Sequence, residues 1–221
     1  MTLESSKNLG GVGAILILIG ALGIFVLPYV LVISLIGIIL VLIALHGLAN
    51  YYKEQKIFSN ALFGFIAQIV GGVSAIVALL YIVFDTTLFT GVLDKIFPGW
   101  NGNWSSLSGM TPTTTGLGIG DFTSILGALL VVGLIFWVFT IVASVFNWRS
   151  LKALSTKANA GLFSSAAIVL VIGAVLTVIF IGFVIMWIAV LMLAIAFFQI
   201  KPQETQPAPM VTASPPAPTP V

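Results

Sequence analysis

The residues able to perform acid–base or nucleophilic chemistry are few in this sequence. His46 is the single histidine, and there is no cysteine. A His- or Cys-rich metal site needs three or four such ligands, so the sequence cannot supply one. A serine hydrolase needs a serine, a histidine and a carboxylate joined by hydrogen bonds of about 3 Å. Whether a carboxylate lies beside His46 depends on the elements that position both residues.

Composition indicates that these elements are membrane helices. Of the 221 residues, 60% are hydrophobic and 6% are charged, and the mean hydropathy is +1.23. An ordinary soluble domain has about 25% charged residues, so this chain lacks the polar groups to cover a surface that faces water. A soluble globule and a nucleic-acid-binding domain are excluded, and the lipid bilayer is the first expected partner. The net charge of +2 is small, and the placement of the basic residues follows membrane topology.

Long apolar runs predict an all-α fold, a bundle of six membrane-spanning helices. A helix needs about 20 apolar residues to cross about 30 Å of hydrocarbon. The last run, residues 162–200, contains 39 residues without a charge. As one straight helix it would be about 58 Å long, so we divide it near Ile181-Gly182. The six predicted helices cover residues 10–27, 30–48, 61–84, 122–146, 162–180 and 182–199.

The predicted connections differ in length and polarity. The first two helices join in a tight hairpin at Leu27-Pro28-Tyr29, because proline cannot continue a helix without losing a hydrogen bond. Residues 85–121 form a long external loop, in which apolar residues from Thr87 to Phe97 recur at helical spacing and predict a short interfacial helix. Residues 1–200 are therefore the predicted transmembrane domain.

The chain ends in a proline-rich tail, residues 201–221. This segment contains seven of the ten prolines, a composition typical of disordered, polyproline-type chain. A solubilising tail and a docking strand for a cytoplasmic partner both fit this composition, and we favour the first.

The basic residues lie on one predicted side of the membrane. With six spans, seven of the eight share that side: Lys7, Lys53, Lys56, Arg149, Lys152, Lys157 and Lys201. Loops rich in Lys and Arg stay in the cytoplasm, which predicts two cytoplasmic termini. His46 lies near the cytoplasmic ends of the helices, whereas Asp85, Asp94 and Asp121 lie outside. A Ser-His-Asp triad cannot assemble across the membrane, and we expect neither catalytic activity nor a cofactor.

The third predicted helix has a continuous stripe of small residues. Gly64, Ala67, Gly71, Ser74 and Ala78 recur at spacings of 3, 4, 3 and 4. Small residues allow helix backbones to approach closely in lipid, where packing drives association. We predict that this stripe is a packing seam of the bundle or of a homo-oligomer. The alternative is that the stripe lines a narrow pore.

Gln68 borders the stripe and is the candidate intramembrane polar contact. The fourth predicted helix offers Gly133, Thr140 and Ser144 at matching helical spacing. The Gln68 amide can bond across to Thr140 or Ser144, which favours packing over a pore.

The external loop contains one candidate modification site. Asn103-Trp104-Ser105 matches the N-x-Ser acceptor of N-glycosylation and lies on the predicted outer face. Asn103 is therefore the candidate glycosylation site.

The six predicted spans contain no Asp, Glu, Lys or Arg. Ionisable residues within the membrane normally mark proton relays and voltage sensors, so neither is expected here. We expect a membrane scaffold or accessory subunit without catalytic activity, whose partner is another copy of itself or another membrane protein. The alternative is a channel or transporter for an uncharged or apolar solute.

Three short segments resemble a family of prokaryotic, mostly archaeal, membrane proteins called domain of unknown function 996. They are Leu9-Gly10-Gly11-Val12-Gly13, then Ala44-Leu45-His46-Gly47-Leu48 followed by Tyr51-Tyr52, and Ala194-Ile195-Ala196-Phe197-Phe198. The resemblance covers roughly residues 5 to 200. It implies the plasma membrane of a prokaryote, and it implies no activity or site residue.

We expect a cysteine placed in the tail, Met210→Cys, to be protected from a membrane-impermeant maleimide in intact cells. Six spans return the tail to the cytoplasm, and the native chain has no cysteine to give a background signal. Labelling after the membrane is permeabilised is the control. Labelling of intact cells would contradict the six-span topology.

Overall fold

The computed structural model describes residues 2–23, 31–85, 87–113 and 116–202. The predicted turn at Leu27-Pro28-Tyr29 and nearly all of the proline-rich tail lie outside these residues. The described residues form an all-helical fold without strands, as predicted. Its elements are α1 (Leu3–Gly23), α2 (Leu31–Tyr51), α3 (Lys56–Asp85), α4 (Thr87–Ile96), η2 (Trp104–Gly109), α5 (Ile119–Ala158), α6 (Gly161–Leu176), η3 (Thr177–Ile179) and α7 (Ile181–Phe198). Six of these helices are long and apolar enough to cross a membrane.

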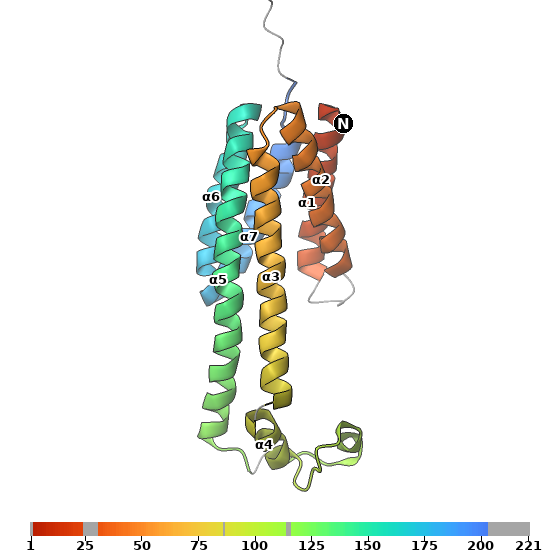
Figure 1. Cartoon of the computed structure of the whole chain (residues 1–221), viewed down its shortest axis with the longest axis vertical. Helices are drawn as coiled ribbons and strands as arrows, with labels where there is room; N and C mark the ends of the chain where they lie inside the picture. Colours follow the sequence, from red (N-terminus) through yellow and green to blue (C-terminus); the bar gives the residue numbers. More distant parts are fainter. Residues whose placement is uncertain (1, 24–30, 86, 114–115, 203–221) are drawn as a thin grey trace, which may run out of the picture.

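The six long helices differ in length. At 1.5 Å per residue, the 40 residues of α5 extend about 60 Å and the 30 residues of α3 about 45 Å. The other four have 16 to 21 residues and extend about 24–32 Å. Figure 1 shows that α3 and α5 continue together beyond the ends of these four helices, toward the end of the molecule where α4 lies.

Helix α5 is longer than the expected span of residues 122–146. It begins at Ile119 and continues through Arg149, Lys152 and Lys157 to Ala158. Charged residues mark where a helix leaves hydrocarbon, but they do not end the helix itself. The helix ends where Asn159 adopts the left-handed conformation, with φ of 49°, a common way of ending a helix.

The hydrophobic core lies at the end of the molecule that contains most basic residues. Its largest fully buried side chains include Leu48, Ile57, Leu154, Phe163 and Phe197, from five different helices. The rings of Phe163 and Phe197 meet edge to face with their centroids 5.2 Å apart, a favourable arrangement for aromatic pairs. This core ties the two short helix pairs to the long pair α3–α5.

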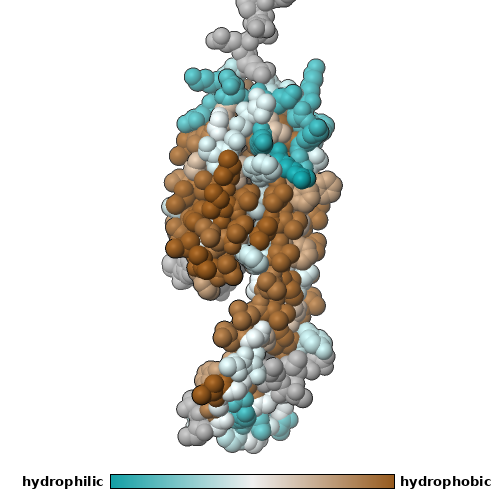
Figure 2. All heavy atoms as spheres, turned by 90° about the vertical axis from the view of Figure 1, so that its left-hand side faces the viewer, coloured by the Kyte–Doolittle hydropathy of each residue, from teal (hydrophilic) through white to brown (hydrophobic). Residues whose placement is uncertain are grey.

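Polar and apolar surfaces are segregated along the long axis. The start of α1, the α2–α3 and α5–α6 connections and the end of α7 all lie at one end (Figure 1). Hydrophilic side chains gather at that end, and the body below it is apolar (Figure 2). Large apolar side chains on the body are exposed, among them Leu130 at 64% and Val73 at 54%. Such a surface suits lipid and not water.

The long final apolar run breaks at Phe180. After α6 the chain forms the short helix η3, and Phe180 adopts a left-handed conformation with φ of 61°. The first residue of α7 is Ile181, so the chain reverses one residue before the division proposed from helix length. Gly182 lies against the Gly173 carbonyl oxygen and leaves no room for a side chain.

Candidate functional site

The small-residue stripe of α3 includes two buried glycines and three half-buried residues: Gly64 and Gly71, and Ala67, Ser74 and Ala78. A Cβ atom added at Gly71 would overlap the Cβ atom of Phe139 on α5. A Cβ atom added at Gly64 would lie 3.0 Å from the Ala143 carbonyl oxygen, also on α5. The stripe glycines therefore face α5 at close range. Gly133 of α5 is exposed, with nothing within 4 Å of its Cβ position, so it lies outside this contact.

The hydroxyl groups of Thr140 and Ser144 bond to their own helix, α5. Thr140 Oγ1 donates to the Phe136 carbonyl at 2.9 Å, and Ser144 Oγ donates to the Ile141 carbonyl at 2.7 Å. Gln68 on α3 is half-buried. Its amide makes no hydrogen bond within the described part of the chain. The anticipated bond between Gln68 and these hydroxyls is therefore absent from the structure.

Sequence reasoning missed a second close seam, between α1 and α2. A Cβ atom at Gly13 would lie 2.7 Å from the Gly37 carbonyl oxygen, and one at Gly37 would lie 2.6 Å from the Gly13 carbonyl oxygen. Gly20 lies against Ser34 in the same way. The signal was available, because Gly13 and Gly20 are seven residues apart and so share one face of a helix.

The contact between α1 and α7 brings together two of the segments that resemble the family. A Cβ atom at Gly10 would lie 2.5 Å from the Phe197 ring, and Phe198 lies similarly against Gly11. Further along, Trp187 Nε1 donates to the Leu18 carbonyl at 3.4 Å. Gly10 and Gly11 therefore leave the space that two aromatic rings of α7 occupy.

His46 lies at the polar end and is bonded to an amide. Its Nε2 atom is 3.2 Å from Asn50 Nδ2, and Gln55 Nε2 donates to Asn50 Oδ1 at 3.1 Å. Glu54, on the same side, pairs with Lys157 at 3.6 Å. These contacts do not form a carboxylate–histidine–serine relay. Within the described ranges, no three His, Cys, Asp or Glu side chains gather into a group able to hold a metal.

Tyr52, just after α2, is the one buried side chain in the described residues with an unpartnered polar atom. It is 9% exposed, and its hydroxyl makes no hydrogen bond. Burial raises the pKa of this phenol, and the neighbouring Tyr51 raises it further. The group therefore stays neutral and acts as a space-filling ring.

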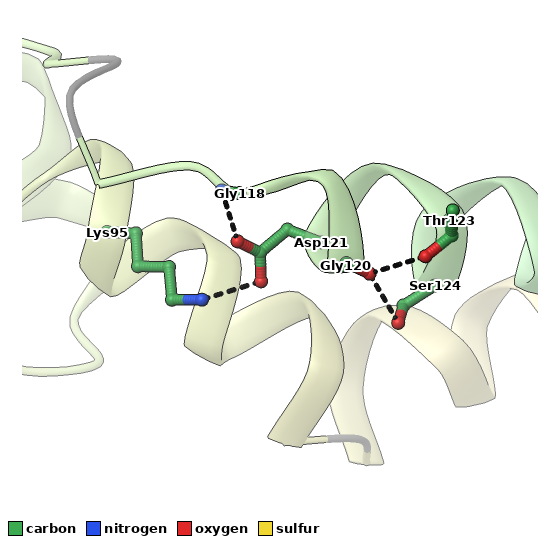
Figure 3. Close-up of polar contacts among 6 residues, drawn as sticks. All are labelled: Lys95, Gly118, Gly120, Asp121, Thr123 and Ser124. Atoms are coloured by element: carbon green, nitrogen blue, oxygen red, sulfur yellow. Dashed lines mark hydrogen bonds and ion pairs between the residues drawn. The ribbon is translucent and has the colours of Figure 1, made fainter.

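At the opposite end, an ion pair ties α4 to the start of α5 (Figure 3). Lys95 Nζ lies 2.6 Å from Asp121 Oδ1, and the Gly118 backbone N–H donates to Asp121 Oδ2 at 2.9 Å. The Lys95 hydrogen bond, followed by the Gly118 bond, lowers the pKa of the Asp121 carboxyl. Thr113 N–H also donates to the Ile96 carbonyl at 2.7 Å. Together these contacts fix both ends of the loop between α4 and α5.

Asn103 occupies a tight turn in that loop. Its side-chain oxygen accepts from the Ser105 backbone N–H at 3.1 Å and from the Ser105 hydroxyl at 2.8 Å. Asn103 is exposed. Both residues of the acceptor motif are thus at the surface and in contact with each other.

The structure has six long apolar helices, a basic end, and the Lys95–Asp121 ion pair at the opposite end. These features define a multi-pass, all-α protein of membrane type. The chain belongs to the family described as protein of unknown function (DUF996), whose profile matches residues 33–191. It is similar to the uncharacterised protein MJ1644 of Methanocaldococcus jannaschii, with 22% identity over 200 residues that cover 90% of this chain and 94% of the relative. No solved structure matches the chain.

We predict that Gly71→Leu destabilises the folded protein by about 1–3 kcal/mol, the usual cost of overpacking a close contact. A leucine at this position would overlap Phe139 and push α3 away from α5. Thermal melting in detergent measures the effect. Val70→Leu is the matched control, since Val70 is 44% exposed and should melt like the parent. The reverse order of the two melting temperatures would place the seam on another face of α3.

We also predict that Asp121→Asn loosens the loop between α4 and α5. Because the pKa of Asp121 is lowered in the folded protein, its ion pair is fully present above the ordinary pKa of about 3.9. The pair is lost only as the pH falls through the lowered value. A spin label at Ser108→Cys should therefore gain mobility in strong acid.

In Asp121→Asn the same label should already be mobile at neutral pH. Asp94→Asn is the control, because Asp94 is exposed and makes none of the contacts that fix the loop. Equal label mobility in all three proteins at neutral pH would show that the ion pair does not order the loop.

Proposed function

We propose that this protein is a membrane scaffold or accessory subunit without catalytic activity. The observation that supports this most strongly is how the helices use their small and polar residues. Glycines bring α1 against α2 and α3 against α5 so closely that no Cβ atom fits without displacement. The hydroxyls of Thr140 and Ser144 donate to carbonyls of their own helix, and the Thr177 hydroxyl donates to the Gly173 carbonyl of α6. Side chains used in this way build a rigid body and leave little polar surface for a substrate.

The proposed setting is the plasma membrane of a prokaryote, with both termini in the cytoplasm. The gathering of Lys and Arg at the end that also holds the start of α1 supports this orientation. Asn103, at the other end, would then face outward and be open to glycosylation. The proposed partners are the lipid bilayer and either a second copy of the chain or another membrane protein, and not nucleic acid.

One observation favours a second candidate, a channel or transporter for an uncharged or apolar solute. The Gln68 amide is half-buried among apolar helices and has no hydrogen-bond partner within the described residues. An unpaired amide at membrane depth is costly, and a passing polar solute or water would satisfy it.

Two measurements on the purified full-length protein separate these functions. We expect the protein extracted from its native membrane in mild detergent to have the mass of a defined assembly, with itself or with a second membrane protein. We expect liposomes that contain it to shrink in hyperosmotic glycerol at the rate of empty liposomes.

Faster glycerol or water flux that is lost in Gln68→Leu would establish the channel and overturn the scaffold. Gln68→Leu removes the amide and keeps a side chain of similar size. A monomeric mass together with unchanged flux would contradict both candidates.

A further inference from the structure

The connection between α6 and α7 is made of apolar, exposed side chains. Four consecutive residues around the reversal are Val178, Ile179, Phe180 and Ile181, and they are 62%, 59%, 78% and 57% exposed. No charged residue occurs between Lys157 and Lys201. Turns that emerge into water are rich in Gly, Pro, Asn, Asp and Ser, so this connection has the composition of a surface that never meets water.

Phe180 occupies a backbone conformation that usually belongs to glycine or asparagine. Its φ is 61°, where a residue with a Cβ atom is strained. In water a glycine or asparagine would be favoured at this exposed position. In hydrocarbon a phenyl ring is favoured at this position, because the transfer of a large apolar side chain into lipid is favourable and that of a polar turn residue is unfavourable.

Three carbonyl groups near the turn accept hydrogen bonds from within the protein. The Thr177 hydroxyl donates to the Gly173 carbonyl at 2.8 Å, and the Phe180 N–H donates to the Thr177 carbonyl at 3.0 Å. Trp137 Nε1, from α5, donates to the Val175 carbonyl at 3.1 Å. These carbonyls lie at the end of α6 and the start of η3, and without these donors they would need water. Bonding within the protein is what a chain reversal in hydrocarbon requires.

The contact with Trp137 also fixes the depth of the turn along α5. Between Arg149 and Asp121, α5 has no charged residue, a length of about 42 Å. Trp137 lies about 18 Å from Arg149, and Phe180 lies about 8 Å further along than Val175. The turn is therefore about 26 Å from the level of Arg149 and about 16 Å short of the level of Asp121.

A hydrocarbon layer about 30 Å thick must fit between these two charged levels. If its near face lies at Arg149, the turn is about 4 Å inside the far face. If its far face lies at Asp121, the turn is about 16 Å inside. The turn is within hydrocarbon in both limiting placements.

We propose that the α6–α7 hairpin enters the bilayer from the basic end of the molecule and turns back inside the hydrocarbon without reaching the opposite surface. Lipid acyl chains then occupy the space beyond the turn, against the lower halves of α3 and α5. That surface is apolar and exposed, with Phe122, Leu126 and Leu130 at 59–64%. Figure 2 shows the apolar body narrowing toward this part of the molecule.

Nitroxide labels on single cysteines test this proposal in liposomes that contain the full-length protein. Phe180→Cys and Ile179→Cys report on the turn. Leu130→Cys is the reference for a lipid-facing position, Ser108→Cys for the water-facing loop and Thr156→Cys for the polar end. Collision with oxygen, which concentrates in hydrocarbon, is compared with collision with a water-soluble nickel chelate. Circular dichroism melting shows whether each variant is folded.

We expect both turn labels to lose access to the nickel chelate and to keep access to oxygen, as the Leu130 label does. Nickel access equal to that of the Ser108 label would overturn the proposal, since it would place the turn in water. Low access to both reagents, together with spectral broadening between labels, would overturn lipid as the occupant and place a second copy there. Two turn positions keep the test valid if one variant does not fold.

Discussion

The structure depends on close approach of helix backbones in a solvent that gives helices no other reason to associate. Lipid tails are as apolar as leucine, so burying an apolar side chain between two helices gains little. The free energy of helix association must therefore come from packing contacts and from the close approach of helix backbones. Gly13 against Gly37, Gly71 against Phe139 and Gly10 against Phe197 provide it for three different helix pairs. The close packing of these three helix pairs follows from where the glycines occur.

Much of the architecture could be predicted because the thickness of the hydrocarbon layer sets the length of a helix that spans it. Apolar run length predicts six helices, and the excessive length of the last run requires a reversal close to Phe180, where the structure has it. The same comparison of run length with hydrocarbon thickness does not predict where α5 ends. Leu151 and Leu154 are buried in the core. Their packing stabilises the part of α5 that continues beyond the predicted span of residues 122–146.

The contacts at the candidate sites were less accessible from sequence. The stripe on α3 follows from spacing within one helix, and the structure puts its glycines against α5. The partner of each stripe residue depends on the rotation of a second helix, which is why Gly133 was included although it is exposed. The ion pair between Lys95 and Asp121 joins residues 26 apart across a loop, and no local pattern predicts such a pair.

The unequal helix lengths make the molecule a wedge. Six helices lie side by side toward the basic end, whereas α3 and α5 alone continue to the far end among the described long helices (Figure 1). Each helix occupies a cross-section of about 80–110 Å², so a leaflet that α6 and α7 do not reach contains about 160–220 Å² less protein area. A bilayer accommodates such a shape with least elastic cost where the leaflet at the basic end is on the convex side. The protein would therefore concentrate in curved membrane, and many copies together would bend a flat one.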